Sequence, residues 1–231
     1  MKFEFLPNEI LIECFEYLNA LYIFHAFDQL NYHFDTLSRI IPLYFNSDPV
    51  NRSIFNQFCK KILSNSNVKL QIYSLHLSNT YKCNRINPFL SRLSLNKFPQ
   101  LRSLTLLGVK EDQVENLQQI LPLIPQLFFL HLIQPAHSVT NILIKCSMSK
   151  LRILAVTDSY QHLELIDQIS SITNLTITNC NFHSLQRILK TVTMLKYLNC
   201  SNLFQRQISS NNSIQFKEDY QCNSFKTINY A

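Results

Sequence analysis

The sequence predicts an α/β protein in which a small N-terminal helical unit precedes a curved solenoid of parallel strands alternating with helices. Three observations carry this prediction. Apolar residues recur at helical spacing over residues 1–45, an apolar-x-x-Leu-x-apolar pattern then recurs along the rest of the chain, and stretches with helical spacing separate its copies. Repeated strand–helix units bury one continuous core between neighbours, so the pattern favours a solenoid.

The first helix is predicted to begin near Pro7, because proline tolerates the first turn, where its missing N–H has no intrahelical partner. Glu9 lies near this N-terminus, where the helix dipole favours negative charge. An apolar stripe follows, made of Ile10, Leu11, Cys14, Phe15 and Leu18. A second apolar pattern predicts further short helices and consists of Leu21, Ile23, Phe24, Phe27, Leu30, Phe34 and Leu37. A unit this small builds little core alone and therefore leans on a partner or a neighbouring domain.

Residues 3 to 45 resemble the F-box. The matching stretch runs from Leu6-Pro7 through Phe15 to Leu18, although Cys14 stands where the family has Ile or Val and the tryptophan near the end of the motif is absent. The resemblance implies docking on a Skp-type adaptor, and through it on a cullin. The implied contact residues are Leu6, Pro7, Ile10, Leu11, Phe15 and Leu18. The alternative is an ordinary amphipathic N-terminal hairpin that begins with Leu-Pro.

The turn cluster Asn46-Ser47-Asp48-Pro49 marks the predicted end of this first unit. A helix is predicted from Ser53 to Leu63, with one apolar face, and Ser64-Asn65-Ser66-Asn67 is predicted to break it. The expected organisation is therefore residues 1–45 as the F-box-like unit, 46–67 as a linking helix, and 68–231 as the repeats.

Six copies of the repeat pattern begin at residues 72, 101, 127, 151, 172 and 195, and a weaker seventh begins at residue 225. The alternating end of each copy predicts a short strand with its Leu residues facing inward. Helices are predicted between the copies, over residues 87–95, 111–124, 138–148, 162–172 and 182–192. The polar stretch 201–224 is predicted to be a loop, and the last copy ends without a helix, as in a fragment or a short form of the fold.

Residues 68–231 resemble leucine-rich repeats, whose pattern is Leu-x-x-Leu-x-Leu-x-x-Asn/Cys. Only Cys180 meets the Asn/Cys position, so irregular loops are expected after the other strands. In this family the x positions of the strands line a concave binding face. Those expected to hold a protein substrate are Leu107, Phe129, His131, Ile133, Ile153 and Tyr197. The alternative is that a loop, or the 201–224 segment, covers this apolar patch.

The composition excludes several classes of function. The chain has one glycine, Gly108, which excludes glycine-rich phosphate loops, and its seven cysteines include no CxxC pair, which opposes a metal site or a disulfide framework. Neither GxSxG nor HExxH occurs, so we expect no enzyme and no cofactor. Basic residues are scattered, with only Lys60-Lys61 adjacent, so we expect no nucleic-acid binding. No apolar run has signal-peptide or membrane length, and a reducing compartment, cytoplasm or nucleus, is expected.

Charge is unevenly spread. Residues 1–45 carry a net charge of −4 and the remainder +10, which suggests two surfaces with different partners, or a chance bias among solvated helix faces. The order of the two resemblances is that of the substrate receptors of Skp–cullin–F-box ubiquitin ligases. The sequence thus predicts a substrate adaptor for protein ubiquitination; the alternative is a repeat scaffold that binds protein outside any ligase.

Overall fold

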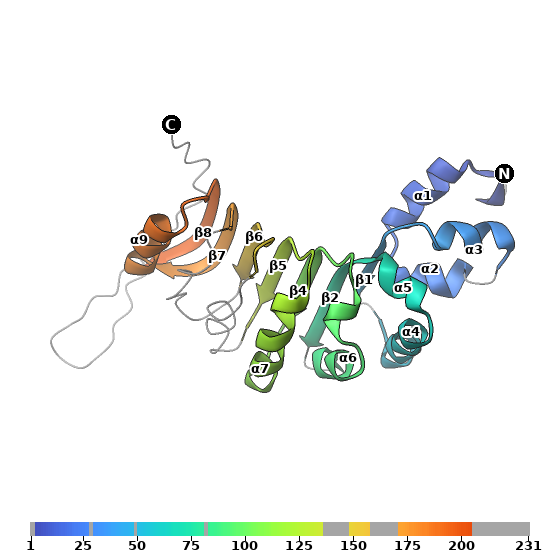
Figure 1. Cartoon of the computed structure of the whole chain (residues 1–231), viewed down its shortest axis with the longest axis horizontal. Coiled ribbons are helices and arrows are strands. Elements are labelled where there is room, and N and C mark those ends of the chain that lie inside the picture. The colour runs from blue at the N-terminus through green and yellow to red at the C-terminus, as the bar shows by residue number, and fades with distance from the viewer. Residues whose placement is uncertain are drawn as a thin grey trace. The chain divides into compact units, whose positions relative to one another are not determined.

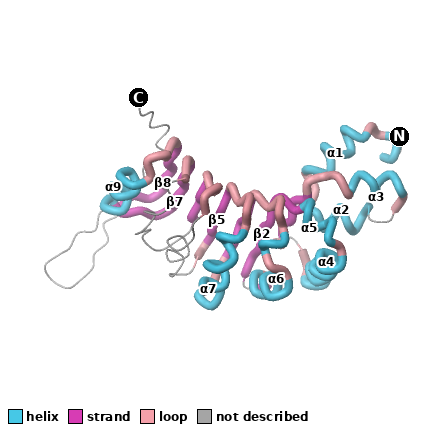
Figure 2. The backbone as a smooth tube through the Cα atoms, viewed as in Figure 1, coloured by secondary structure: helices cyan, strands magenta, loops and turns pink. Residues whose placement is uncertain are grey.

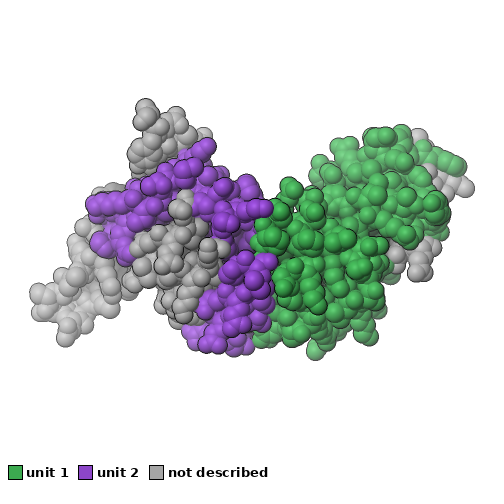
Figure 3. Space-filling view, in the orientation of Figure 1, with its two compact units in different colours: residues 1–104, 124–126 green, residues 105–123, 127–231 purple. Residues whose placement is uncertain are grey.

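The computed structural model describes residues 3–27, 30–48, 50–80, 83–135, 148–157 and 171–204. Strands of a parallel sheet alternate with helices along the chain (Figures 1 and 2), which confirms the predicted α/β class. The chain divides into two compact units, residues 1–104 with 124–126 and residues 105–123 with 127–231 (Figure 3). The division falls inside a strand, β4 (Ser103–Leu107).

The first unit begins with a single 3-10 turn, η1 (Phe3–Phe5), and three short helices, which are α1 (Asn8–Glu16), α2 (Ala20–Phe27) and α3 (Tyr32–Ser38). It continues with β1 (Leu43–Asn46), α4 (Arg52–Ser64), α5 (Ser66–Gln71), β2 (Ile72–Thr80), β3 (Cys83–Asn84), α6 (Ile86–Arg92) and η2 (Leu95–Lys97). The helix predicted at residues 53–63 is therefore confirmed as α4. The predicted break at residues 64–67 is wrong in part, because α5 begins one residue after Asn65.

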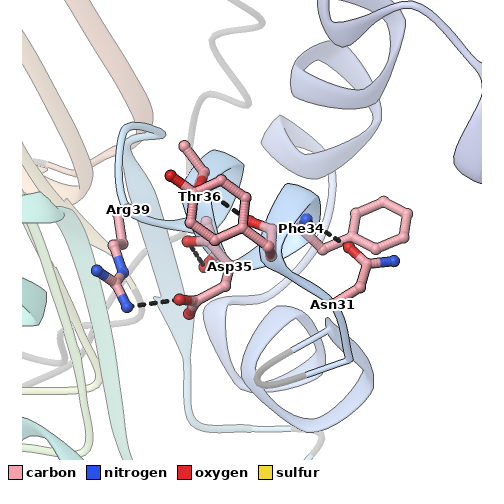
Figure 4. A network of polar contacts seen from close by, with 7 residues as sticks. Asn31, Phe34, Asp35, Thr36 and Arg39 are labelled. Atoms are coloured by element: carbon pink, nitrogen blue, oxygen red, sulfur yellow. Dashed lines mark hydrogen bonds and ion pairs between the residues drawn. The ribbon is translucent and has the colours of Figure 1, made fainter.

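Asparagine side chains start several of these helices. The side-chain oxygens of Asn31, Asn51 and Asn65 accept hydrogen bonds from backbone N–H groups of the first turns of α3, α4 and α5 at 3.0, 2.9 and 2.9 Å. Figure 4 shows the first of these caps, together with the ion pair between Asp35 and Arg39 one turn apart on α3. Asparagine side chains thus satisfy backbone N–H groups that have no partner within the first turn of a helix.

Strand β1 is an element that the sequence analysis did not predict. It pairs in parallel with β2, and Phe45 lies beside Leu75 in the register. The boundary predicted at residue 45 therefore falls within a strand of the sheet. A hydrogen bond joins the N-terminal helices to the same region, because the Gln71 side chain donates to the backbone carbonyl of Ser38 at 2.8 Å. The helical head and the first strands share one compact unit.

Aromatic rings fill the core of the first unit. One cluster joins α1, α2 and α3, with the ring centroids of Phe15 and Phe27 4.8 Å apart and those of Phe27 and Phe34 5.2 Å apart. A second cluster centres on Phe45, which stacks on Phe58 of α4 at 4.4 Å. These rings are the reason that short helices with few turns each hold their positions, since large aromatic side chains bury much apolar area per residue.

The second unit contains the end of β4 and then α7 (Glu111–Ile120), η3 (Leu121–Leu123), β5 (Phe129–Ile133), β6 (Ile153–Thr157), β7 (Asn174–Asn181), α9 (Phe182–Thr191) and β8 (Tyr197–Phe204). The strand order is β4-β5-β6-β7-β8, and each pair from β5 to β8 is parallel. The predicted helices at 138–148 and 162–172 and the copy at residue 225 lie almost wholly outside the described residues. The loop predicted over residues 201–224 is wrong at its start, because β8 continues to Phe204, and the rest of that stretch lies outside the described residues.

The repeated Leu positions are buried as predicted. Leu130, Leu154 and Leu175 lie side by side in the register of β5, β6 and β7, and each is fully buried. Gly108 and Gln134 follow β4 and β5 and both have positive φ, 69° and 47°. Each donates its N–H to the end of the next strand, at 2.8 and 3.0 Å. The only glycine of the chain therefore stands where the backbone must turn sharply after a strand.

Candidate protein-binding surfaces

Helix α1 carries two apolar stripes that lie next to each other around the helix. Leu11, Phe15 and Leu18 lie on one face at i, i+4 and i+7, and Ile10, Cys14 and Tyr17 lie on the neighbouring face at the same spacing. We call the second set the outer stripe of α1. The sequence analysis joined most of these residues into a single stripe, since adjacent positions on a helix differ by only about 100°.

The two stripes differ in exposure. Leu11 and Phe15 are fully buried, and the Phe15 ring packs against Phe27 and Phe34. In the outer stripe Ile10 is 44% exposed and Tyr17, at the end of the helix, is 84% exposed. The outer stripe therefore presents apolar surface to solvent, whereas Leu11 and Phe15 form the core of the helical head.

The six residues predicted to contact an adaptor thus separate into two groups. Pro7 and Ile10 are exposed, and Leu6 and Leu18 are half-buried. Leu11 and Phe15 offer no surface to a partner while the head is folded as described, so their contact with an adaptor stays a prediction. The sequence analysis missed Tyr17, although its spacing of seven residues from Ile10 was the signal that could have identified it.

A second surface lies on the strands of the second unit, on the face where side chains alternate with the buried Leu residues. We call it the open strand face, made of Leu107, Phe129, His131, Ile133 and Ile153. All five are half-buried, and Phe129 lies directly beside Ile153 in the register of β5 and β6. The end of β4 lies beside Ile133, because the N–H that follows Leu107 donates to the Ile133 carbonyl at 2.8 Å.

Polar groups divide this face. The His131 ring lies between Phe129 and Ile133 along β5, and its Nε2 is 3.0 Å from the Thr157 hydroxyl on β6. Tyr197 belongs to β8 and is separated from Ile153 by Asn174 of β7. The structure thus brings five of the six predicted residues together on adjacent strands and leaves Tyr197 two strands away. Thr157, which fixes the His131 ring, was not among the predicted site residues.

His76 of β2 is expected to make the stability of the first unit depend on pH. Its Nε2 lies 3.2 Å from the Asp48 carboxylate. Burial lowers the pKa of His76 below its ordinary value of 6.5, and the charge of Asp48 acts in the opposite direction. The unfolded chain therefore takes up a proton before the folded chain does, and we expect the free energy of unfolding to fall as the pH is lowered through 6.5.

Urea unfolding measured between about pH 7.5 and pH 5.5 checks this expectation. His76→Asn should flatten the dependence. Asp48→Asn should make the dependence steeper. It removes the negative charge that favours the protonated ring, whereas burial, which disfavours that ring, remains. An unchanged slope in His76→Asn would assign the pH dependence to another group.

The described residues contain no group of three or more metal-ligating side chains. The thiols of Cys59, Cys180 and Cys200 are buried, and the neighbouring Cys200 thiol, together with burial, raises the pKa of Cys180. Cys180, which meets the Asn/Cys position of the repeat pattern, is fully buried. Within the described part of the chain, none of the helices combines the length and the apolar character needed to cross a bilayer.

Compared with known proteins, the chain matches no protein-family model. A search of curated proteins likewise finds no match.

Proposed function

We propose that the chain is a substrate-recognition subunit of a Skp–cullin–F-box ubiquitin ligase. The N-terminal helices are proposed to dock on a Skp-type adaptor, and the strand–helix repeats, as leucine-rich repeats, to hold a protein substrate for ubiquitination. In this role the chain performs no chemistry itself. It raises the effective concentration of the substrate near an enzyme held elsewhere in the complex.

The outer stripe of α1 is the observation that carries the adaptor proposal. A helix in a folded protein normally buries its apolar residues in one stripe. Helix α1 instead keeps Ile10 and Tyr17 exposed beside a stripe that is already buried. Exposed apolar and aromatic side chains on a small unit are typical of protein interfaces, since burying them in a partner removes apolar area from water.

The open strand face supports the proposal that the repeats bind a protein substrate. Its described members are apolar or aromatic apart from His131, and Thr157 and Asn174 border them. A half-buried apolar centre with a polar rim is the usual composition of a protein interface. The named residues of this face include no Lys, Arg, Asp or Glu, which favours an apolar segment of the substrate.

Capture by a purified Skp-type adaptor tests the proposal. The full chain should bind, and Ile10→Asp should weaken binding about tenfold or more, because it places a charge in the centre of the proposed contact. The thermal unfolding midpoint should change little, since the Ile10 side chain is exposed. Affinity is measured by titration, and folding by circular dichroism of the same samples.

Leu123→Asp is the matched control. Leu123 is also an exposed apolar residue, but it lies in η3, far along the chain from α1. Binding by Leu123→Asp should equal that of the parent chain. If the parent chain does not bind the adaptor at all, the ligase proposal is wrong. That result would favour the alternative, a repeat protein that binds another protein outside any ligase. The burial of Leu11 and Phe15 favours that alternative.

A further inference from the structure

A cavity of about 210 Å³ in the first unit is lined by three arginines from two helices. Arg52 lies in the first turn of α4, and Arg85 and Arg92 lie at the two ends of α6. None of the seven described residues that line the cavity is acidic. The sequence analysis described the basic residues as scattered, and only the packing of α4 against α6 brings these three together.

Arg85 forms the inner wall of this arginine cavity. It is only 5% exposed, and its guanidinium donates a hydrogen bond to the backbone carbonyl of Val50. The same group lies over the Phe55 ring, 5.5 Å from the centroid. These contacts fix the orientation of the guanidinium. A fixed, largely desolvated guanidinium interacts more strongly with an entering anion than one in water.

Arg92 and Arg52 lie at the exposed rim. Arg92 follows Arg85 by seven residues, which is two helical turns, so both project from the same face of α6. Its guanidinium donates to the Asn56 side-chain oxygen at 3.1 Å, which directs it towards α4. Burial raises the pKa of Cys59 to about 11, and Arg92 opposes that rise, so the positive potential of Arg92 extends into α4.

We propose that the arginine cavity binds a phosphate dianion, carried on a serine or threonine side chain of a peptide or present as free phosphate. Three guanidinium forks supply more N–H donors than the two oxygens of one carboxylate can accept, whereas a phosphate presents three terminal oxygens and about twice the charge. Arg52 and Arg92 contact the phosphate oxygens from the rim. Phe55 and Pro88 give the cavity an apolar wall. The site shares no residue with the proposed adaptor and substrate surfaces.

Binding of inorganic phosphate and of a short phosphoserine peptide to the full chain tests this site, with the unphosphorylated peptide as a third probe. Calorimetric titration should give saturable binding of the phosphorylated probes. Arg52→Gln with Arg92→Gln should weaken it at least about tenfold, because two charge-assisted contacts are lost. Both side chains are exposed, so the unfolding midpoint of this double variant should stay near that of the parent.

The matched control is Lys60→Gln with Lys97→Gln, which removes two exposed positive charges of the same unit outside the cavity. Retained binding in this control supports the site, and an equal loss would overturn it in favour of diffuse electrostatic attraction. The proposal would also be overturned if neither inorganic phosphate nor the phosphoserine peptide bound saturably. Tighter binding of the phosphopeptide than of phosphate assigns the ligand to a modified side chain, and equal binding assigns it to free phosphate.

Discussion

Phe45→Ala is expected to destabilise the first unit by about 3–5 kcal/mol, the usual cost of deleting a buried aromatic ring. The Phe45 ring is almost wholly buried and stacks on Phe58 at 4.4 Å, with Phe55 and Phe89 at 6.1 and 6.3 Å. One ring thus connects β1 with α4 and α6. Urea unfolding followed by far-ultraviolet circular dichroism measures the change in the free energy of unfolding.

Tyr44→Ala is the control in the same strand. Tyr44 is 40% exposed and points to the opposite face from Phe45. Its replacement should cost clearly less than that of Phe45, because 40% of the Tyr44 surface stays in water and gains nothing from burial. Equal effects of the two substitutions would mean that β1 does not pack in the core of the first unit.

The strand positions were predictable because their pattern is local. Alternation within five residues decides which side chains face inward, and the same alternation recurs in each copy of the repeat. Leu104, Leu130 and Leu154 are accordingly all fully buried. The residues of the open strand face follow from the same alternation, but their neighbours depend on register, and the register places Asn174 between Ile153 and Tyr197.

Strand β1 could not be predicted in the same way. It has four residues, and Phe45 and Ser47 stand where the other copies have Leu and a second apolar residue. Its pairing is tertiary, since Ser47 N–H donates to the His76 carbonyl at 2.9 Å, and the Ser47 hydroxyl accepts from the N–H of Ser78 at 3.1 Å. A buried serine whose polar groups are hydrogen-bonded cannot be recognised from the pattern of hydrophobic residues in the sequence.

The binding surfaces were predictable only in part. Helical spacing identified the apolar residues of α1, but it could not decide which of Ile10 and Leu11 is buried, because that depends on where α2 and α3 pack. The arginine cavity had one local signal, the spacing of seven residues between Arg85 and Arg92. Arg52 enters from another helix, so its contribution depends on tertiary packing alone.

Phe15→Ala is expected to cost about 3–5 kcal/mol as well, although Phe15 belongs to the motif that suggested adaptor binding. Its ring is fully buried between those of Phe27 and Phe34, at centroid distances of 4.8 and 6.4 Å. Removing it leaves a cavity among α1, α2 and α3. The measurement is again urea unfolding, with Tyr17→Ala as the exposed aromatic control on the same helix, for which little loss of stability is expected.

Phe15→Ala also distinguishes two roles of the motif, which are packing in the core of the head and contact with the adaptor. If Phe15 acts only as core, Phe15→Ala weakens adaptor capture in proportion to the fraction of chains unfolded, and a lower temperature that refolds the head restores capture. Ile10→Asp should behave in the opposite way, with a folded head and weak capture at every temperature, since its exposed side chain lies in the proposed contact. Weak capture by a fully folded Phe15→Ala chain would contradict this division, and would mean that the adaptor contacts the Phe15 ring after the head rearranges.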